Sequence, residues 1–231
     1  MAYTTFLQPL PADRRLARSV LLMVGLTLYG LSDAMLVVAG LGLDPWDVLH
    51  QGLSRAVGGQ VGTWTDIVGV VVLLAWIPLR QKPGVGTVTN VVVIGIVVNI
   101  CLALLPSPHG WQLQSVVMVS AVVLNALATG LYIGAGLGPG PRDGLMTGFA
   151  ARGHSVRVVR TGIELTVLAV GWLLGGTVGA GTVIYAMAIG PLVHVTLPLL
   201  SFTSKPSATG PRARSGRTGW GGSSRLLRRP T

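Results

Sequence analysis

The residues best suited to chemistry in this sequence are polar side chains that fall inside long apolar stretches. Asp33 is the clearest of them, about two thirds of the way along an apolar run over 19–43. Ionisable groups inside membrane spans are costly to keep there and commonly mark solute or proton pathways. We therefore expect Asp33 to take part in a solute-binding site, with hydrogen bonding between helices as the structural alternative.

Three pairs of polar side chains occupy equivalent positions when the two halves of the chain are aligned: Tyr29 with Asn125, Asp33 with Thr129, and Asn99 with His194. Within each half the first two positions are four residues apart, so they share one helix face. We expect these six residues to converge at mid-membrane, where they are candidates for a substrate-binding site. For the Asn, Thr and Tyr residues, interhelical hydrogen bonds of about 1 kcal/mol each are the alternative; for His194 the alternative is a neutral packing role.

No catalytic centre, cofactor site or metal site is expected. The sequence contains no G-x-S-x-G, H-E-x-x-H or P-loop motif. Cys101 is the only cysteine, and His194 has no second His or Cys near it in sequence. Glu164 follows Arg160 by four residues, a spacing that predicts a local ion pair on a helix.

The elements that position these residues are membrane-spanning helices. Hydrophobic residues make up 50% of the chain and charged residues only 10%, against about a quarter in soluble domains. Crossing a hydrocarbon core of about 30 Å takes about 20 apolar residues. The sequence has six stretches of suitable length: 19–43, 61–79, 85–105, 113–133, 158–176 and 180–200.

Basic residues predict how these spans are oriented. With the N-terminus inside the cell, 16 of the 17 Lys and Arg residues, Arg142 among them, fall in cytoplasmic segments, and only Arg55 lies outside. This bias is typical of multi-pass proteins of the plasma membrane. It explains the net charge of +10 without nucleic acid and predicts cytoplasmic N- and C-termini.

Two polar segments flank the spans. Residues 1–18 form a short cytoplasmic lead, and residues 203–231 are rich in Ser, Gly, Pro and Arg. We expect the second segment to be a disordered, basic, cytoplasmic tail, because its composition cannot form a packed core. Such a tail could bind anionic lipid headgroups, although a simply solvated tail is the usual case.

The chain also repeats itself. Ala39–Leu49 recurs as Ala135–Leu145, an offset of 96 residues, and further Gly, Thr and Trp matches follow in order. Each unit, 19–105 and 113–200, holds three spans. Because three is odd, the second unit must enter the membrane from the opposite side, which predicts the inverted repeats found in many secondary transporters.

The repeated block predicts a short helix after the first span of each unit. Pro45 and Pro141 suit the first position of such a helix, and Asp47 and Asp143 suit its first turn, beside free N–H groups. Capped helices at the membrane interface are one interpretation. Re-entrant half-helices whose N-termini face a substrate from opposite sides are the other.

At this block the sequence resembles a bacterial family of predicted integral membrane proteins, the YczE/YitT-like group. The resemblance rests on Ala39–Leu49, on Ala135–Leu145 and on the Val-Gly-x-Gly-Thr-Val segment at 178–183, and it covers about residues 15–200. The G-L-G-P-G-P-R-D-G-L stretch is closer to the YczE branch. The resemblance implies a multi-pass membrane protein.

Two functions fit these features. The first is a transporter or exporter of a small molecule, with a site between the halves and with Asp33 as the candidate for proton coupling. It rests partly on analogy with other inverted-repeat folds. The alternative is a non-transporting scaffold or accessory protein in the bilayer that binds a partner or lipid.

Overall fold

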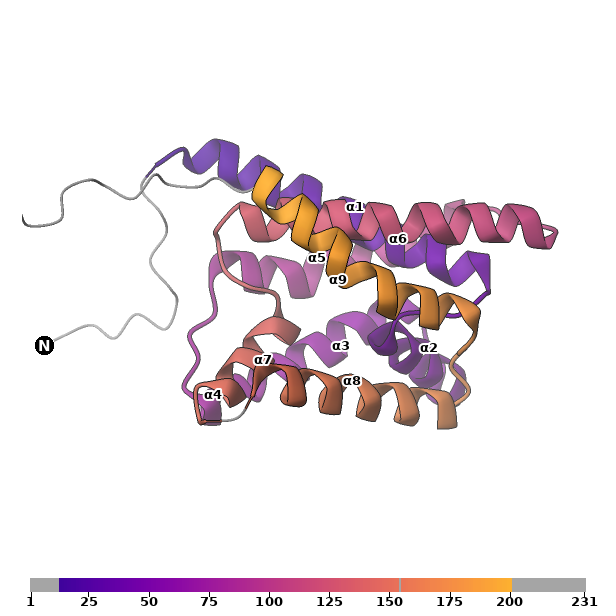
Figure 1. The fold of residues 1–231 in the computed structure, drawn as a ribbon. Coiled ribbons are helices and arrows are strands. Elements are labelled where there is room, and N and C mark those ends of the chain that lie inside the picture. Colours follow the sequence, from indigo (N-terminus) through magenta and orange to yellow (C-terminus); the bar gives the residue numbers. More distant parts are fainter. Residues whose placement is uncertain (1–12, 154, 201–231) are drawn as a thin grey trace, which may run out of the picture.

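A computed structural model describes residues 13–153 and 155–200, and every regular element in these ranges is a helix (Figure 1). The described residues form eight helices of ten residues or more and one of four residues. In chain order they are α1 (Arg15–Ala39), α2 (Pro45–Val57), α3 (Val61–Leu74), α4 (Trp76–Leu79), α5 (Val85–Leu104), α6 (Trp111–Gly134), α7 (Pro141–Ala150), α8 (Val156–Leu173) and α9 (Ala180–Leu200).

Five spans among the described residues are long and apolar enough to cross a membrane: α1, α3 together with α4, α5, α6 and α9. The sequence predicted six. The predicted sixth, over 158–176, corresponds to α8, whose 18 residues include Arg157, Arg160 and Glu164. Because of these three charged residues, α8 is not among the five spans that are apolar enough to cross a membrane. The predicted basic tail over 203–231 and most of the predicted N-terminal lead lie outside the described residues.

Helices α1 and α6 pack against each other in opposite directions at the centre of the fold. Gly25, early in α1, lies against the backbone of Tyr132, late in α6, where an added Cβ would come within 2.7 Å of the amide nitrogen. Further along α1, Asp33 meets Asn125, which comes earlier in α6. Helix α5 flanks α1 and α9 flanks α6, so these four helices form one layer (Figure 1).

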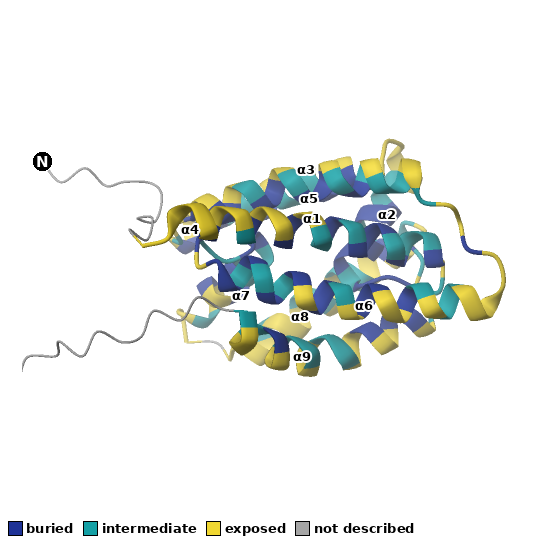
Figure 2. Cartoon of the chain, turned by 90° about the horizontal axis from the view of Figure 1, so that it is seen from above, coloured by how far each residue is buried: buried dark blue, intermediate teal, exposed yellow. Residues whose placement is uncertain are grey.

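Helices α2, α3, α7 and α8 form the second layer. Apolar side chains fill the interior; one core cluster includes Leu36, Val48 and Met118, and another includes Leu26 and Val98. Figure 2 shows exposed positions along the outer sides of the helices. Many of these exposed residues are large and hydrophobic. An apolar outer surface of this extent is typical of contact with a lipid bilayer.

Two loops of matching shape lead into the short helices. Gly40 and Gly136 both have a left-handed backbone, with φ of 69° and 67°, and each ends a long helix. The first span therefore ends at Ala39, four residues before the predicted boundary. Asp44 then caps α2 by accepting the backbone N–H groups of Trp46 (2.9 Å) and Asp47 (3.3 Å).

Pro45 and Pro141 occupy the first positions of α2 and α7, and Asp47 and Asp143 lie in the first turns. The first turn of α2 is largely buried, and that of α7 is buried at Pro141 and Gly144 and half-buried at Arg142 and Asp143. At the far end of α2, Val57 is 68% exposed. The first turn of each short helix is therefore directed into the protein.

The two halves differ in how tightly their outer helices pack. Helix α3 lies directly on α5, so that an added Cβ on Gly95 would lie 2.2 Å from the carbonyl oxygen of Gly62 and 1.9 Å from Oδ1 of Asp66. Helices α8 and α9 stand apart. Gly162 and Gly190, which correspond to Asp66 and Gly95 in the repeat, have open space around the position of a Cβ.

This difference predicts unequal responses to the same substitution. Gly95→Ala forces α3 away from α5, and overpacking of this kind costs about 1–3 kcal/mol. Gly190→Ala meets nothing and should leave stability near that of the wild type. Melting temperatures of the two purified variants in one detergent measure the contrast. Equal melting temperatures would show that α3 and α5 are not in close contact.

Candidate functional site

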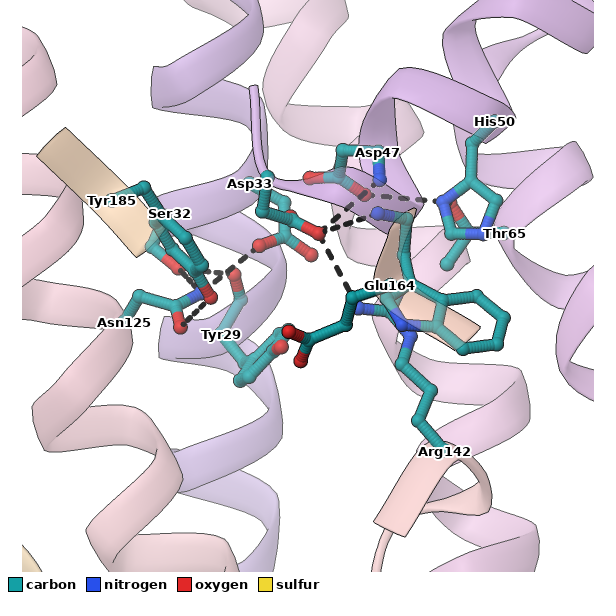
Figure 3. A network of polar contacts seen from close by, with 12 residues as sticks. Tyr29, Ser32, Asp33, Asp47, His50, Thr65, Asn125, Arg142, Glu164 and Tyr185 are labelled. Carbon is teal, nitrogen blue, oxygen red and sulfur yellow. Dashed lines mark hydrogen bonds and ion pairs between the residues drawn. The ribbon is translucent and has the colours of Figure 1, made fainter. Parts of the chain in front are cut away.

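The beginnings of α2 and α7 meet inside the protein. Arg142, the second residue of α7, extends to Asp44, the cap of α2, with 3.7 Å between its Nη1 and Oδ1 of the carboxylate. Its guanidinium carbon lies 5.0 Å from the centre of the Trp46 ring. Figure 3 shows the Arg142 side chain reaching toward the acidic group. An ion pair and a cation–π contact thus link the two halves of the chain.

Neighbouring side chains hold the start of α7 in this place. The indole Nε1–H of Trp76 donates to the carbonyl of Pro141 over 3.0 Å. Gly144 lies flat against the same indole, where an added Cβ would come within 1.9 Å of a ring carbon. Tyr132 donates its hydroxyl proton to Asp143 over 3.2 Å. These contacts fix the helix start from which Arg142 projects.

Asp33 and Asp47 join Asp44 in an acidic cluster. One carboxylate oxygen from each of these residues lies within 4.8 Å of the others, and all three side chains are almost fully buried. Asp47 Oδ1 lies 3.1 Å from Nδ1 of His50, which is itself 3.1 Å from the Thr65 hydroxyl. Three carboxylates therefore share one nearby guanidinium, that of Arg142.

A hydrogen-bond network connects Asp33 to two other helices. Asn125 on α6 donates from Nδ2 to Asp33 Oδ1 over 3.1 Å and to the Ser32 hydroxyl over 2.9 Å. Tyr185 on α9 donates to Oδ1 of Asn125 over 3.0 Å. All of these side chains are buried, and Figure 3 shows them between α1, α6 and α9. The network fixes the orientation of the Asp33 carboxylate.

A cavity of about 680 Å³ extends from this polar centre into the space between α8 and α9. Asp44 and Arg142 line its inner part. Arg160 and Glu164 line the α8 side, where Arg160 Nε donates to Glu164 Oε1 over 2.8 Å, as the spacing predicted. A space of this size is typical of small-molecule sites.

Most of the predicted site residues gather here. Tyr29, Thr129 and His194 line the cavity, and Asp33 and Asn125 lie in the network behind it. Asn99 does not join them.

Asn99 accepts the backbone N–H of Gly62 over 2.8 Å and donates to the Thr63 hydroxyl. It fastens α5 to α3, away from the cavity. Its repeat partner His194 reaches the cavity because α9 is not covered by α8.

The sequence did not identify Asp44, Trp46, His50 and Tyr132 as site residues, and its pattern of basic residues assigned Arg142 to a cytoplasmic segment. In the structure Arg142 lies in the first turn of α7, and its side chain is 23% exposed and paired with Asp44. The available signal was its position between Pro141 and Asp143, within the repeated helix start.

Comparisons with known proteins agree with this picture of a membrane protein. The family of unknown function DUF6198 matches residues 16–198. An uncharacterized protein of Haemophilus influenzae is 36% identical over 182 residues, which cover 78% of this chain and 84% of that protein. The uncharacterized membrane protein YczE of Bacillus subtilis is 36% identical over 160 residues, 68% of this chain and 74% of YczE.

The uncharacterized protein YyaS of Bacillus subtilis is 26% identical over 191 residues, 79% of this chain and 94% of YyaS. No solved structure matches the chain. The expected resemblance to YczE is confirmed, and these relatives are bacterial. The chain therefore belongs to the DUF6198 family and is a multi-pass membrane protein homologous to YczE.

Proposed function

We propose that the protein transports a small polar solute through the cavity where the two halves meet. The observation that carries this proposal is the contact between the starts of α2 and α7, where the buried Asp44 and the half-buried Arg142 line a cavity of about 680 Å³. Transporters with inverted repeats place their sites at interrupted helix ends between the halves. The contact between the two first turns favours re-entrant half-helices over helices at the membrane interface.

Matching contacts in the two halves support an inverted repeat. Gly86 donates its backbone N–H to the carbonyl of Leu137 over 2.8 Å, and its repeat equivalent Gly181 donates to Leu41 over the same distance. In each case a helix of one half contacts the loop of the other. Such reciprocal contacts are expected around a two-fold axis, and the opposed directions of α1 and α6 agree with it.

We include α8 as the sixth span. Its 18 residues cover about 27 Å at 1.5 Å per residue, close to the thickness of a hydrocarbon core. Arg160 and Glu164 neutralise each other at the cavity wall. Six spans place both termini on one side of the membrane, and the bias of basic residues favours the cytoplasmic side.

The unequal packing of the two halves suggests how access alternates. In this structure α3 is closed on α5, while α8 is separated from α9 by the cavity. Exchanging the conformations of two inverted repeats gives a second state, open on the opposite side. In that state α9 covers α8 near Gly162, and α5 separates from α3.

Cross-linking tests this exchange. In a Cys101→Ala background, we expect Gly162→Cys combined with Gly190→Cys to cross-link in membranes with a short thiol-specific reagent, because the second state brings these positions together. The control pairs Gly162→Cys with Leu199→Cys, nine residues further along α9 and on its opposite face. Absence of a link in the first pair, or equal linking in both, would contradict the exchange.

Solute movement tests the function itself. Asp33→Asn removes a buried charge but keeps an oxygen that can accept from Asn125, so the fold should persist while solute handling is lost. We expect untargeted mass spectrometry to find at least one metabolite whose ratio inside and outside cells depends on the wild-type chain. That dependence should fall about tenfold or more in Asp33→Asn.

Asp66→Asn is the matched control, because Asp66 lies at the contact with Gly95 and away from the cavity. All variants are compared at equal amounts in the membrane. If no metabolite depends on the wild-type chain, or if Asp33→Asn behaves like the wild type, the transport proposal fails and a scaffold role is favoured.

A further inference from the structure

We propose that Asp33, Asp44 and Asp47 form a binding site for a hard divalent cation, of the size of Ca²⁺. This inference goes beyond transport of a solute, and it stands independently of it. The sequence predicted no metal centre because His and Cys residues do not cluster in it. The site proposed here consists of carboxylate oxygens, which Ca²⁺, Mg²⁺ and Mn²⁺ prefer.

Unsatisfied oxygen atoms are the first argument. Oδ2 of each of the three aspartates is buried and has no hydrogen-bond partner among the described residues. Asp33 is 1% exposed, and Asp44 and Asp47 are each 2% exposed. Buried acceptors are nearly always satisfied in proteins, and a buried charged acceptor left without a partner is especially costly.

The other oxygens of these residues already have partners. Oδ1 of Asp33 accepts from Asn125, Oδ1 of Asp44 accepts two backbone N–H groups, and Oδ1 of Asp47 lies beside His50. These contacts orient the carboxylates and leave one oxygen of each available. Preorganisation of ligands by neighbouring hydrogen bonds is typical of metal sites.

Charge balance is the second argument. When ionised, the three carboxylates carry three negative charges, and Arg142 supplies one positive charge, 3.7 Å from Asp44. His50 is the other titratable side chain in contact with the cluster, through Asp47. With all three ionised, two negative charges would have no counter-charge in a buried region where water screens poorly. One divalent cation neutralises both.

Geometry is the third argument. Two oxygens on opposite sides of one ion are separated by about twice the metal–oxygen distance, which gives roughly 4.6–5.2 Å for Ca²⁺ and roughly 4.2 Å for Mg²⁺. One carboxylate oxygen of each aspartate lies within 4.8 Å of one from each of the others. This upper limit falls within the range for two oxygens on opposite sides of Ca²⁺. Asp44 also lines the cavity, so an ion can reach the cluster from it.

The test uses the full chain in detergent at pH 7.5, with Ca²⁺ alone as the probe. We expect equilibrium dialysis with radioactive Ca²⁺ to give one ion per chain, and saturating Ca²⁺ to raise the melting temperature by roughly 5 °C or more. Na⁺ at equal ionic strength should have no such effect. Asp33→Asn and Asp47→Asn should each weaken Ca²⁺ binding at least tenfold, whereas Asp66→Asn should bind as the wild type does.

Several results would overturn the site: no bound Ca²⁺, a rise in melting temperature that Na⁺ reproduces, or binding that survives both cluster substitutions. If one cluster variant fails to fold, the other variant and the dialysis of wild-type protein still show whether the cation site exists. Failure of transport is read separately, because a chain that binds Ca²⁺ but moves no metabolite keeps the cation site and loses only the proposed function.

Discussion

Three carboxylates lie together inside a bundle whose outer surface is apolar, and one guanidinium reaches them from the other half of the chain. A single buried charge without a counter-charge costs several kcal/mol. The positions of the helices around the carboxylates are therefore constrained by the need to bring a positive charge to them. Arg142 can reach Asp44 only if the start of α7 is drawn into the protein. Trp76 and the absence of a side chain at Gly144 make that position possible.

The same constraint links the fold to the proposed transport. A helix start exposes free N–H groups, which must find partners wherever water is excluded. Asp44 satisfies two of them at the start of α2. Two such starts, directed at each other from opposite halves, create a polar centre that spanning helices alone could not supply. The gap between α8 and α9 opens this centre to a cavity, while tight packing of α3 on α5 closes the other half.

Much of the fold follows from sequence alone, because span length and apolar composition are local properties. The positions of Pro45 and Pro141 at helix starts are local too, as is the pairing of Arg160 with Glu164 one helical turn away.

The site was less accessible from sequence, because its main contacts join residues that are far apart in the chain. A charge count assigns Arg142 to a cytoplasmic segment, but it does not predict which side chain Arg142 contacts. Asn99 and His194 are equivalent in the repeat but differ in surroundings, because only one half is closed. The sequence repeat therefore predicted a more symmetric site than the structure contains.

The most direct test of the account is whether Asp44 and Arg142 stabilise the protein as a pair. A double-mutant cycle compares Asp44→Asn, Arg142→Met and the double variant by their free energies of unfolding in bicelles. Asn at position 44 keeps an acceptor for the start of α2. We predict that each single variant loses about 2–5 kcal/mol and that the double variant loses less than the sum by about 1–3 kcal/mol. Losses that add to within about 0.5 kcal/mol would contradict a contact between the two halves at this point.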